Sequence, residues 1–320
     1  MPSHSCTVED PLPQGLRLDR YIADYLKILS RSQIKARNLE ARLNGKPVKI
    51  SRILKSGDFL ELSWLEAESP FLVPQNLPLD VIYEDKRVIV VNKAQGMVVH
   101  PGAGNRQDTL ANVLLYRMYQ NRLTDVTYGL RPGIVHRLDK DTSGLIIAAW
   151  DEEAHAFLSG QFKERKVRKS YAALVYGCPR DTQGFIDKRI VRSRRDRKTF
   201  TVSDKEGRQS LTFYKLVRSY GNCSLLLLRP KTGRTHQLRV HLKYLGNPIL
   251  GDPIYGNSDS RNGKGQPRFK NATLMLHAKS LSLVLPPGSS GALVKPVTFR
   301  TPLPERFLDI IKPIIQRKGD

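Results

Sequence analysis

Two carboxylates, Asp139 and Asp141, lie in the segment RPGIVHRLDKDTSGLIIAAW, which covers residues 131–150. Three cations flank them, namely Arg131, Arg137 and Lys140. Neighbouring positive charge lowers the pKa of a carboxyl group and keeps it ionised. An ionised carboxylate can act as a nucleophile or stabilise positive charge that develops on a substrate. On residue chemistry alone, however, an ordinary surface salt bridge is the better explanation of this pattern.

Motifs for common cofactors are incomplete in this sequence. Residues 102–104 begin a dinucleotide fingerprint, but Gln107 occupies the sixth position, where glycine is required. Gly263 and the lysine after it lack the spacing of a phosphate-binding loop. His136 and Asp139 are close together without further residues at a spacing typical of metal ligands. The sequence therefore gives poor support to a nucleotide-triphosphate, nicotinamide or zinc enzyme.

The overall charge of the chain favours a polyanionic partner. Its 320 residues include 53 Lys and Arg against 30 Asp and Glu, a formal net charge of +23. An excess of this size attracts nucleic acids or anionic membranes. No apolar run approaches the roughly 20 residues of a membrane span, and the N-terminus lacks a signal core. Because the three cysteines form no motif, a disulfide framework is disfavoured and the reducing cytoplasm is the expected location.

The N-terminal quarter is predicted to form a flexible tail, two helices and short strands. Residues 1–15 contain three prolines and no periodic pattern, and they are the expected tail. Apolar spacing predicts a helix over Leu16–Ile28, and Ser30 with Gln33 forms a capping box for a second. That second helix exposes a basic array, Arg31, Lys35 and Arg37. Such an array suits an RNA backbone, although a solvated basic helix face explains it equally well.

The same segment resembles a known RNA-binding domain. The quoted runs LRLDRYIADYL, SRSQIKARN, LNGKPV and LKSGDFLEL follow the order of the small domain named after ribosomal small-subunit protein four. The resemblance implies that residues 16–75 form an RNA-binding domain with its linker. It also implies that Arg31, Lys35 and Arg37 contact RNA.

Residues 76–320 are expected to form a second, larger domain. Short β-type runs outnumber the helical candidates, which are Thr109–Gln120, Glu152–Lys163 and Thr235–Leu245. Strands and helices do not alternate regularly, so a parallel doubly wound sheet is disfavoured. We predict an α+β fold with a mixed, mainly antiparallel sheet and flanking helices.

HRLDKDTSGL is similar to the signature of the RluA-type pseudouridine synthases. Four further segments match the family in order: VIYEDKRVIVVNKAQGMVVHPGAG, KERKVRKSYAALVYG, RPKTGRTHQLRVHLKYLGNPILGDPIYG and LMLHAKSLSLVLP. This chain departs from the family pattern at Ala94 and Asp108, both away from Asp139 in the sequence. The resemblance implies an isomerase that converts uridine in RNA to pseudouridine without a cofactor.

The resemblance also implies roles for individual residues. Asp139 corresponds to the catalytic carboxylate, and Tyr171 to the tyrosine that stacks on the uracil and assists proton removal. Arg234 corresponds to the arginine that pairs with the carboxylate. Arg137 corresponds to the arginine that fills the space left by the extruded base. His136 is interpreted as structural.

The RNA target is less defined by the sequence than the reaction. The family resemblance favours large-subunit ribosomal RNA, and a transfer-RNA synthase is the alternative. Two competing hypotheses are a non-catalytic ribosome-assembly factor and a hydrolase that uses Asp139 with Asp141. The basic segment Lys188–Phe200 is interpreted as a phosphate contact or a disordered loop. A monomer is the expected state.

Overall fold

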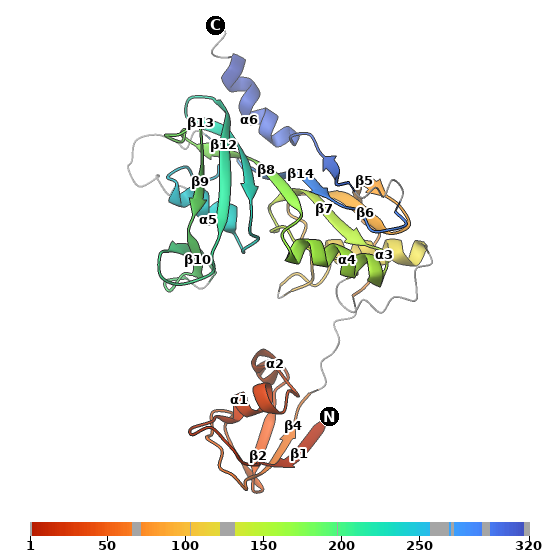
Figure 1. Ribbon diagram of the computed structural model, residues 1–320, viewed down its shortest axis with the longest axis vertical. Helices are drawn as coiled ribbons and strands as arrows, with labels where there is room; N and C mark the ends of the chain where they lie inside the picture. The colour runs from red at the N-terminus through yellow and green to blue at the C-terminus, as the bar shows by residue number, and fades with distance from the viewer. Residues whose placement is uncertain are drawn as a thin grey trace. The chain divides into compact units, whose positions relative to one another are not determined.

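The computed structural model describes residues 2–65, 72–102, 104–121, 132–196, 198–256, 269, 272–289 and 295–316 (Figure 1). The chain divides into two compact units, Met1–Phe71 and Leu72–Asp320, close to the boundary expected after residue 75. Within the described residues, every helix is too short or too polar to cross a membrane.

Unit 1 is a four-stranded sheet with short helical segments. The sheet has the order β1-β4-β2-β3, with strands β1 Ser3–Thr7, β4 Phe59–Ser63, β2 Glu40–Leu43 and β3 Lys46–Pro47. The predicted first helix is shorter, comprising α1 Leu18–Arg20 and a π-helical turn, η1 Tyr21–Tyr25. The capping box at Ser30 begins α2, Arg31–Ala36, as predicted. These elements enclose their own apolar core.

Residues 1–15 were expected to form a flexible tail, but the structure has a strand in this segment. Ser3–Thr7 forms β1, which pairs antiparallel with β4, and Val8 is almost fully buried. The partner of β1 lies more than 50 positions further along the chain, so no local pattern reveals the pairing. The prolines of this segment lie outside the strand, Pro2 before it and Pro11 and Pro13 after it, and do not interrupt it.

Unit 2 is built on one nine-stranded sheet with the order β5-β6-β7-β14-β8-β13-β12-β9, while β15 pairs with β14. All strand pairs are antiparallel except β7 with β14, which confirms the mixed, mainly antiparallel sheet. The strands are β5 Asp80–Glu84, β6 Val88–Lys93, β7 Ser143–Ala149, β8 Arg168–Tyr176, β9 Gln183–Asp187, β12 Leu211–Ser219, β13 Cys223–Pro230, β14 Leu276–Leu283 and β15 Val297–Arg300.

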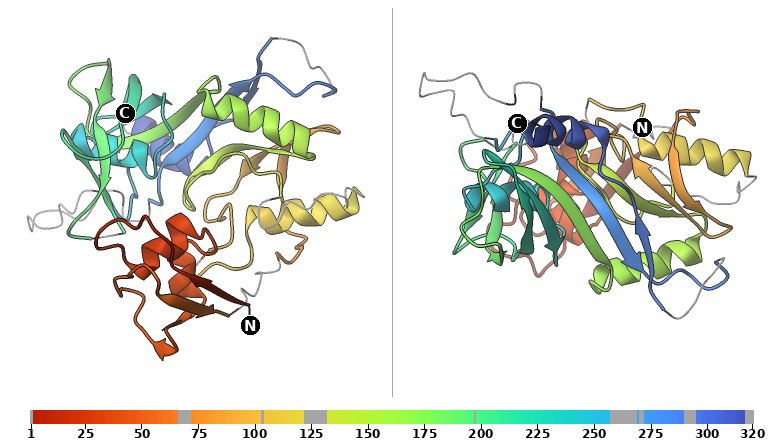
Figure 2. Two further views of the ribbon diagram at one scale, coloured as in Figure 1. Left: turned by 60° about the horizontal axis from the view of Figure 1, so that its bottom comes forward. Right: turned by 90° about the horizontal axis from the view of Figure 1, so that it is seen from above.

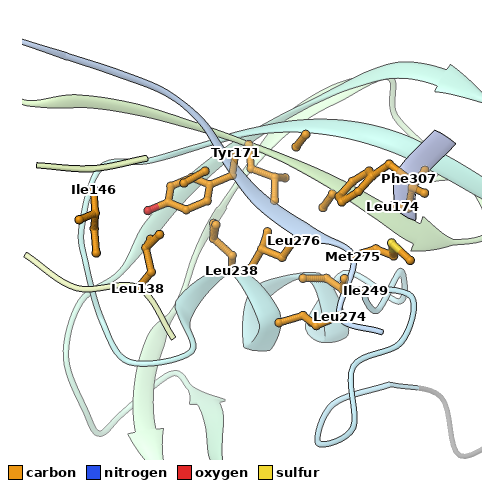
Figure 3. Close-up of a cluster of buried hydrophobic side chains, with 14 of the residues drawn as sticks. Leu138, Ile146, Tyr171, Leu174, Leu238, Ile249, Leu274, Met275, Leu276 and Phe307 are labelled. Carbon is orange, nitrogen blue, oxygen red and sulfur yellow. The ribbon is translucent and has the colours of Figure 1, made fainter. Parts of the chain in front are cut away.

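Helices cover both faces of this sheet (Figure 2). The helices are α3 Leu110–Gln120, α4 Glu152–Lys163, α5 Gln237–Tyr244 and α6 Glu305–Gln316. The larger core contains side chains of α3, α5 and α6, and Figure 3 shows part of it. A smaller core on the other face contains Ala154 and Leu158 of α4. Strand β7 is buried along its whole length because its alternate residues enter the two cores.

Helix α6 and the β10–β11 hairpin are among the elements that were not predicted from the sequence. Helix α6 contains Pro313, which argues against a helix interior, yet Phe307 and Ile311 anchor it in the larger core. The basic segment after residue 188 forms a hairpin of β10 Arg189–Arg192 and β11 Phe200–Ser203. The described residues of this segment are therefore ordered, which contradicts the disordered loop, one of its two interpretations.

A buried polar chain ties α6 to the sheet. Arg306 donates from Nη2 to Ser143 Oγ at 2.6 Å. Ser143 Oγ lies 2.8 Å from His277 Nδ1, within hydrogen-bond distance of the ring. His277 is fully buried, and this burial, with the charges of Arg306 and Lys279, lowers its pKa to about 4.

This histidine makes folding stability depend on pH. Below pH 6.5 the unfolded chain binds a proton that folded His277 takes up only near pH 4, so the protein loses stability as the pH falls. The loss amounts to about 2 kcal/mol at pH 5. We expect His277→Asn, which keeps an acceptor for Ser143, to flatten the fall in unfolding free energy between pH 6.5 and 5. Urea unfolding across this range measures it, and identical slopes in both proteins would contradict the assignment.

Candidate active site

Asp139 lies on the loop that leads into β7. Leu138 is buried in the larger core (Figure 3), whereas Arg137 is exposed and the Asp139 side chain is 22% exposed. The buried leucine therefore anchors the loop, and its two neighbours face outward. This places a carboxylate at the surface on a segment that packing holds in place.

The same loop is pinned by the segment after β6. Gly96 donates its backbone N–H to the Lys140 carbonyl at 2.9 Å, and the Lys93 ammonium donates to that carbonyl at 3.1 Å. The Gln95 side-chain amide donates to the Asp141 carbonyl at 2.9 Å. These three bonds fix the backbone directly after Asp139, and the sequence analysis did not anticipate them.

Lys93 is fully buried, an unusual position for an ammonium group. It also donates to the carbonyls of Ala94 and Met97, each at 2.8 Å. Burial lowers the pKa of Lys93 to about 8, although Asp141 and Asp139 oppose this shift. The residue therefore places positive charge behind the carboxylate loop. In the sequence, Lys93 is marked only by its position at the end of β6, two residues after the apolar run Val88–Val91.

Arg239 is the arginine beside Asp139. Its Nη1 lies 3.6 Å from Asp139 Oδ2, and its side chain is 4% exposed. Nε and Nη2 donate to the two carboxylate oxygens of Asp252 at 2.8 and 2.7 Å. Burial raises the pKa of Asp252, but the hydrogen bonds and charge of Arg239 outweigh this and hold it below its usual value.

Arg234 was expected to pair with Asp139, and the structure places it elsewhere. Its Nε donates to the backbone carbonyl of Gln209 at 3.5 Å, and it lines an open cleft. Helix α5 starts only at Gln237, so Arg239 is in its first turn and points inward. Among the described residues, the ion pair of Asp139 is the one with Arg239.

Tyr171 lies in β8, with 9% of its surface exposed. Figure 3 shows its ring beside Leu138 and Leu238. Burial, and to a smaller extent the negative charge of Asp139, raise the pKa of the Tyr171 hydroxyl well above its usual range. The electrostatic effect of Asp139 reaches the phenol, so these two predicted residues lie within electrostatic range of each other.

A glycine determines how closely their strands approach. Ala278 of β14 is the register partner of both Gly144 in β7 and Tyr171 in β8. Gly144 has a φ of +115°, and a Cβ there would meet the Ala278 backbone nitrogen at 2.5 Å. Only glycine fits this position. The glycine of the TSG run therefore lets the loop strand pack against the strands that carry Tyr171.

His236 is a further residue near the carboxylate that the sequence analysis did not single out. Its φ of +55° is unusual for a residue with a side chain, and its Nδ1 lies 2.8 Å from the Tyr255 hydroxyl. That hydroxyl accepts the backbone N–H of Phe200 at 2.9 Å. Burial lowers the pKa of His236 despite the opposing charge of Asp139. His236 is thus linked through the Tyr255 hydroxyl to Phe200 of the β10–β11 hairpin, and it also lies within the electrostatic range of Asp139.

A cleft of about 1770 Å³ runs over the sheet and includes Arg137 and Arg234 in its lining. Eleven Lys and Arg residues line it, whereas none of its described lining residues is Asp or Glu. His136 also lines the cleft; its Nε2 accepts the N–H of Ile147, and its ring stacks on Phe162. This fits the structural role predicted for His136. The cleft has the charge of a polyanion-binding surface.

The remaining predicted contacts lie in unit 1. Arg31 is exposed and bonded to Asp19 at 3.3 Å, and Arg37 is partly exposed. The Lys35 side chain lies outside the described residues. Arg31 and Arg37 are thus accessible from solvent on or directly after α2.

Comparison with known proteins gives one consistent family. Residues 87–244 match the family described as RNA pseudouridylate synthase. Ribosomal large subunit pseudouridine synthase D of Borreliella burgdorferi is 44% identical over 275 residues, 84% of this chain and 82% of that one. The protein of that name in Zymomonas mobilis is 38% identical, with 89% and 91% covered. The structure of human RNA Pseudouridylate Synthase Domain Containing 4 is similar with a TM-score of 0.56 and 26% identity, covering 73% of this chain and 92% of that one.

Because Arg239 belongs to a buried ion pair and Arg234 does not, substitutions of the two arginines should change the unfolding free energy by different amounts. Arg239→Gln leaves the Asp252 charge buried without its partner, which should lower the unfolding free energy by about 3–5 kcal/mol. Arg234→Gln, in the open cleft, should change it by less than about 0.5 kcal/mol. Denaturant unfolding compares them. The double variant Arg239→Met/Asp252→Leu should recover much of the loss, and a further loss there would contradict this account.

Proposed function

The chain belongs to the RNA pseudouridine synthase family, and we propose that it isomerises uridines of large-subunit ribosomal RNA with Asp139 as its nucleophile. Relatives named for the ribosomal large subunit align along most of both chains. The observation that carries the catalytic assignment is the position of Asp139. It is a partly exposed carboxylate, held by a buried arginine and two residues along the chain from Arg137, which lines a basic cleft.

The reaction rearranges bonds within one nucleotide. The bond from the anomeric carbon of ribose to ring nitrogen one breaks, and a bond from that carbon to carbon five of uracil forms. The proton leaving carbon five is balanced by one gained at nitrogen one, so reactant and product are isomers. The protein must therefore extrude the base, hold it while it turns, and move one proton.

Asp139 supports the step in which the base detaches. The Arg239 guanidinium at 3.6 Å orients the carboxylate and balances its negative charge. Because Asp252 takes the two short hydrogen bonds of Arg239, the contact with Asp139 is longer and leaves carboxylate lone pairs free. A charged, partly exposed oxygen can then attack the anomeric carbon as the bond to nitrogen one breaks, and the attack of carbon five on that carbon later releases the carboxylate.

Tyr171 supplies the wall against which the base is held. Its raised pKa keeps the phenol neutral at physiological pH, which favours stacking and hydrogen bonding over action as a phenolate base. Arg137 lies two residues before Asp139, is exposed and lines the cleft. A planar guanidinium at that position can fill the space that the extruded uridine leaves in its RNA stack.

The choice of substrate rests on the basic surfaces and on the relatives. Unit 1 carries Arg31, Lys35 and Arg37, which we propose bind phosphates of a structured RNA. Arg234 is proposed as a phosphate contact within the cleft. Transfer RNA remains the alternative substrate. The cytoplasmic location and the monomeric state stay predictions.

We expect Asp139→Asn to abolish isomerisation while RNA affinity changes less than about threefold, because the amide keeps the shape but loses the attacking charge. Pseudouridine mapping by chemical labelling and reverse-transcription stops, in cells with and without the gene, measures activity. Sites that vanish with the gene should return with the wild type and stay absent with the variant.

The same mapping separates the competing functions. Sites in transfer RNA would move the substrate away from the ribosome, and release of uracil from RNA by the purified protein would indicate a hydrolase. Full restoration of all sites by Asp139→Asn would refute the nucleophile. Purified enzyme on unmodified ribosomal RNA provides the control for redundancy among synthases.

The contribution of unit 1 to RNA binding can be measured from the salt dependence of the affinity. Replacing Arg31, Lys35 and Arg37 together by Gln should lower the slope of log affinity against log salt by about 0.7–0.9 for each phosphate that the variant no longer neutralises. Binding to a ribosomal RNA fragment across a series of salt concentrations measures the slope. Thermal unfolding of unit 1 serves as the control, and an unchanged slope would place the phosphate contacts elsewhere.

A further inference from the structure

A pair of exposed phenylalanines lies on neighbouring strands of unit 2. Phe185 of β9 and Phe213 of β12 are 65% and 38% exposed. They are direct register partners, and their ring centroids are 6.1 Å apart. Strand β9 is an edge strand of the sheet formed by the described residues. Neither ring contributes to a buried core.

The row of side chains continues onto a third strand. Arg229 of β13 is the register partner of Phe213 on the other side, so three consecutive strands present two rings and a guanidinium on one face. Strands β9, β12 and β13 lie side by side in Figure 1. Ile186 and Tyr214 are buried and point to the opposite face. Neighbouring side chains of a strand point to opposite faces. The strands therefore cannot turn the two rings inward without exposing Ile186 and Tyr214.

The surroundings define what such a row can bind. Phe185, Phe213 and Arg229 all line the basic cleft that also contains Arg137. Flat apolar groups within an array of cations, with no acidic residue among the described lining, match a ligand that combines a polyanionic backbone with flat rings. An acidic peptide would use the charge and leave the rings without partners. Unpaired bases of RNA use both.

We propose that Phe185, Phe213 and Arg229 form a platform on which unpaired bases near the target uridine stack. This inference rests on the proposed function, which makes RNA the occupant of the cleft. Bases within a duplex are already stacked and paired, so the platform selects RNA that is single-stranded beside the target. It supplies recognition and takes no part in the bond rearrangement at Asp139.

The test separates base stacking from charge. The double variant Phe185→Leu/Phe213→Leu keeps apolar volume and every cation of the cleft. Its binding is measured with a labelled oligouridylate of about 15 nucleotides, long enough to fill one or more single-strand sites, and with an abasic ribose-phosphate oligomer of the same length. We expect a loss on the order of tenfold for the oligouridylate and no change for the abasic oligomer. Phe157→Leu, an exposed phenylalanine of α4 outside the cleft, is the matched control and should change neither.

Equal affinity of wild type and double variant for the oligouridylate would overturn the platform, as would equal losses for both ligands. A change in oligomeric state of the double variant by sedimentation would also overturn it, because the rings would then cover a second copy. Isomerisation by the wild type is measured in parallel on ribosomal RNA. A platform effect without isomerisation would refute the proposed function alone, and isomerisation without a platform effect would refute the platform alone.

Discussion

Arg239 carries its charge into the interior of unit 2, where Asp252 accepts two of its hydrogen bonds at 2.8 and 2.7 Å. Such a buried pair is costly to form and more costly to break. The pair positions the arginine, because Nη1 of the guanidinium remains for Asp139 Oδ2 at 3.6 Å. Asp252 thus fixes an arginine that in turn fixes the reactive carboxylate. The rest of the site depends on the burial of this one side chain.

The loop of Asp139 is also held by the ammonium of Lys93. Its bond to the Lys140 carbonyl and the bond from Gln95 to the Asp141 carbonyl leave the backbone little freedom. The buried charges of Arg239 and Lys93 balance the carboxylate without requiring a surface partner that RNA would have to displace. The cleft, with no acidic residue among its described lining, is then free to bind phosphates along its length.

Much of this arrangement could be predicted from the sequence, and the failures have physical causes. The spacing around Asp139 and the bounds of Glu152–Lys163 are local features, and the structure has that loop and that helix. Local sequence could not show whether Arg234 or Arg239 pairs with Asp139. The pairing depends on the left-handed conformation of His236 and on the start of α5 one residue later. Strand β1 likewise depends on a partner distant in sequence.

The sheet separates chemistry from recognition. Gly144, Ala278 and Tyr171 form one row across β7, β14 and β8, and a side chain at Gly144 would force these strands apart. Residues of that row can therefore change little without moving the loop of Asp139 away from Tyr171. The outer row at Phe213 projects into solvent from strands whose opposite faces carry the core. Substitutions there can alter which RNA binds while the catalytic row keeps its geometry.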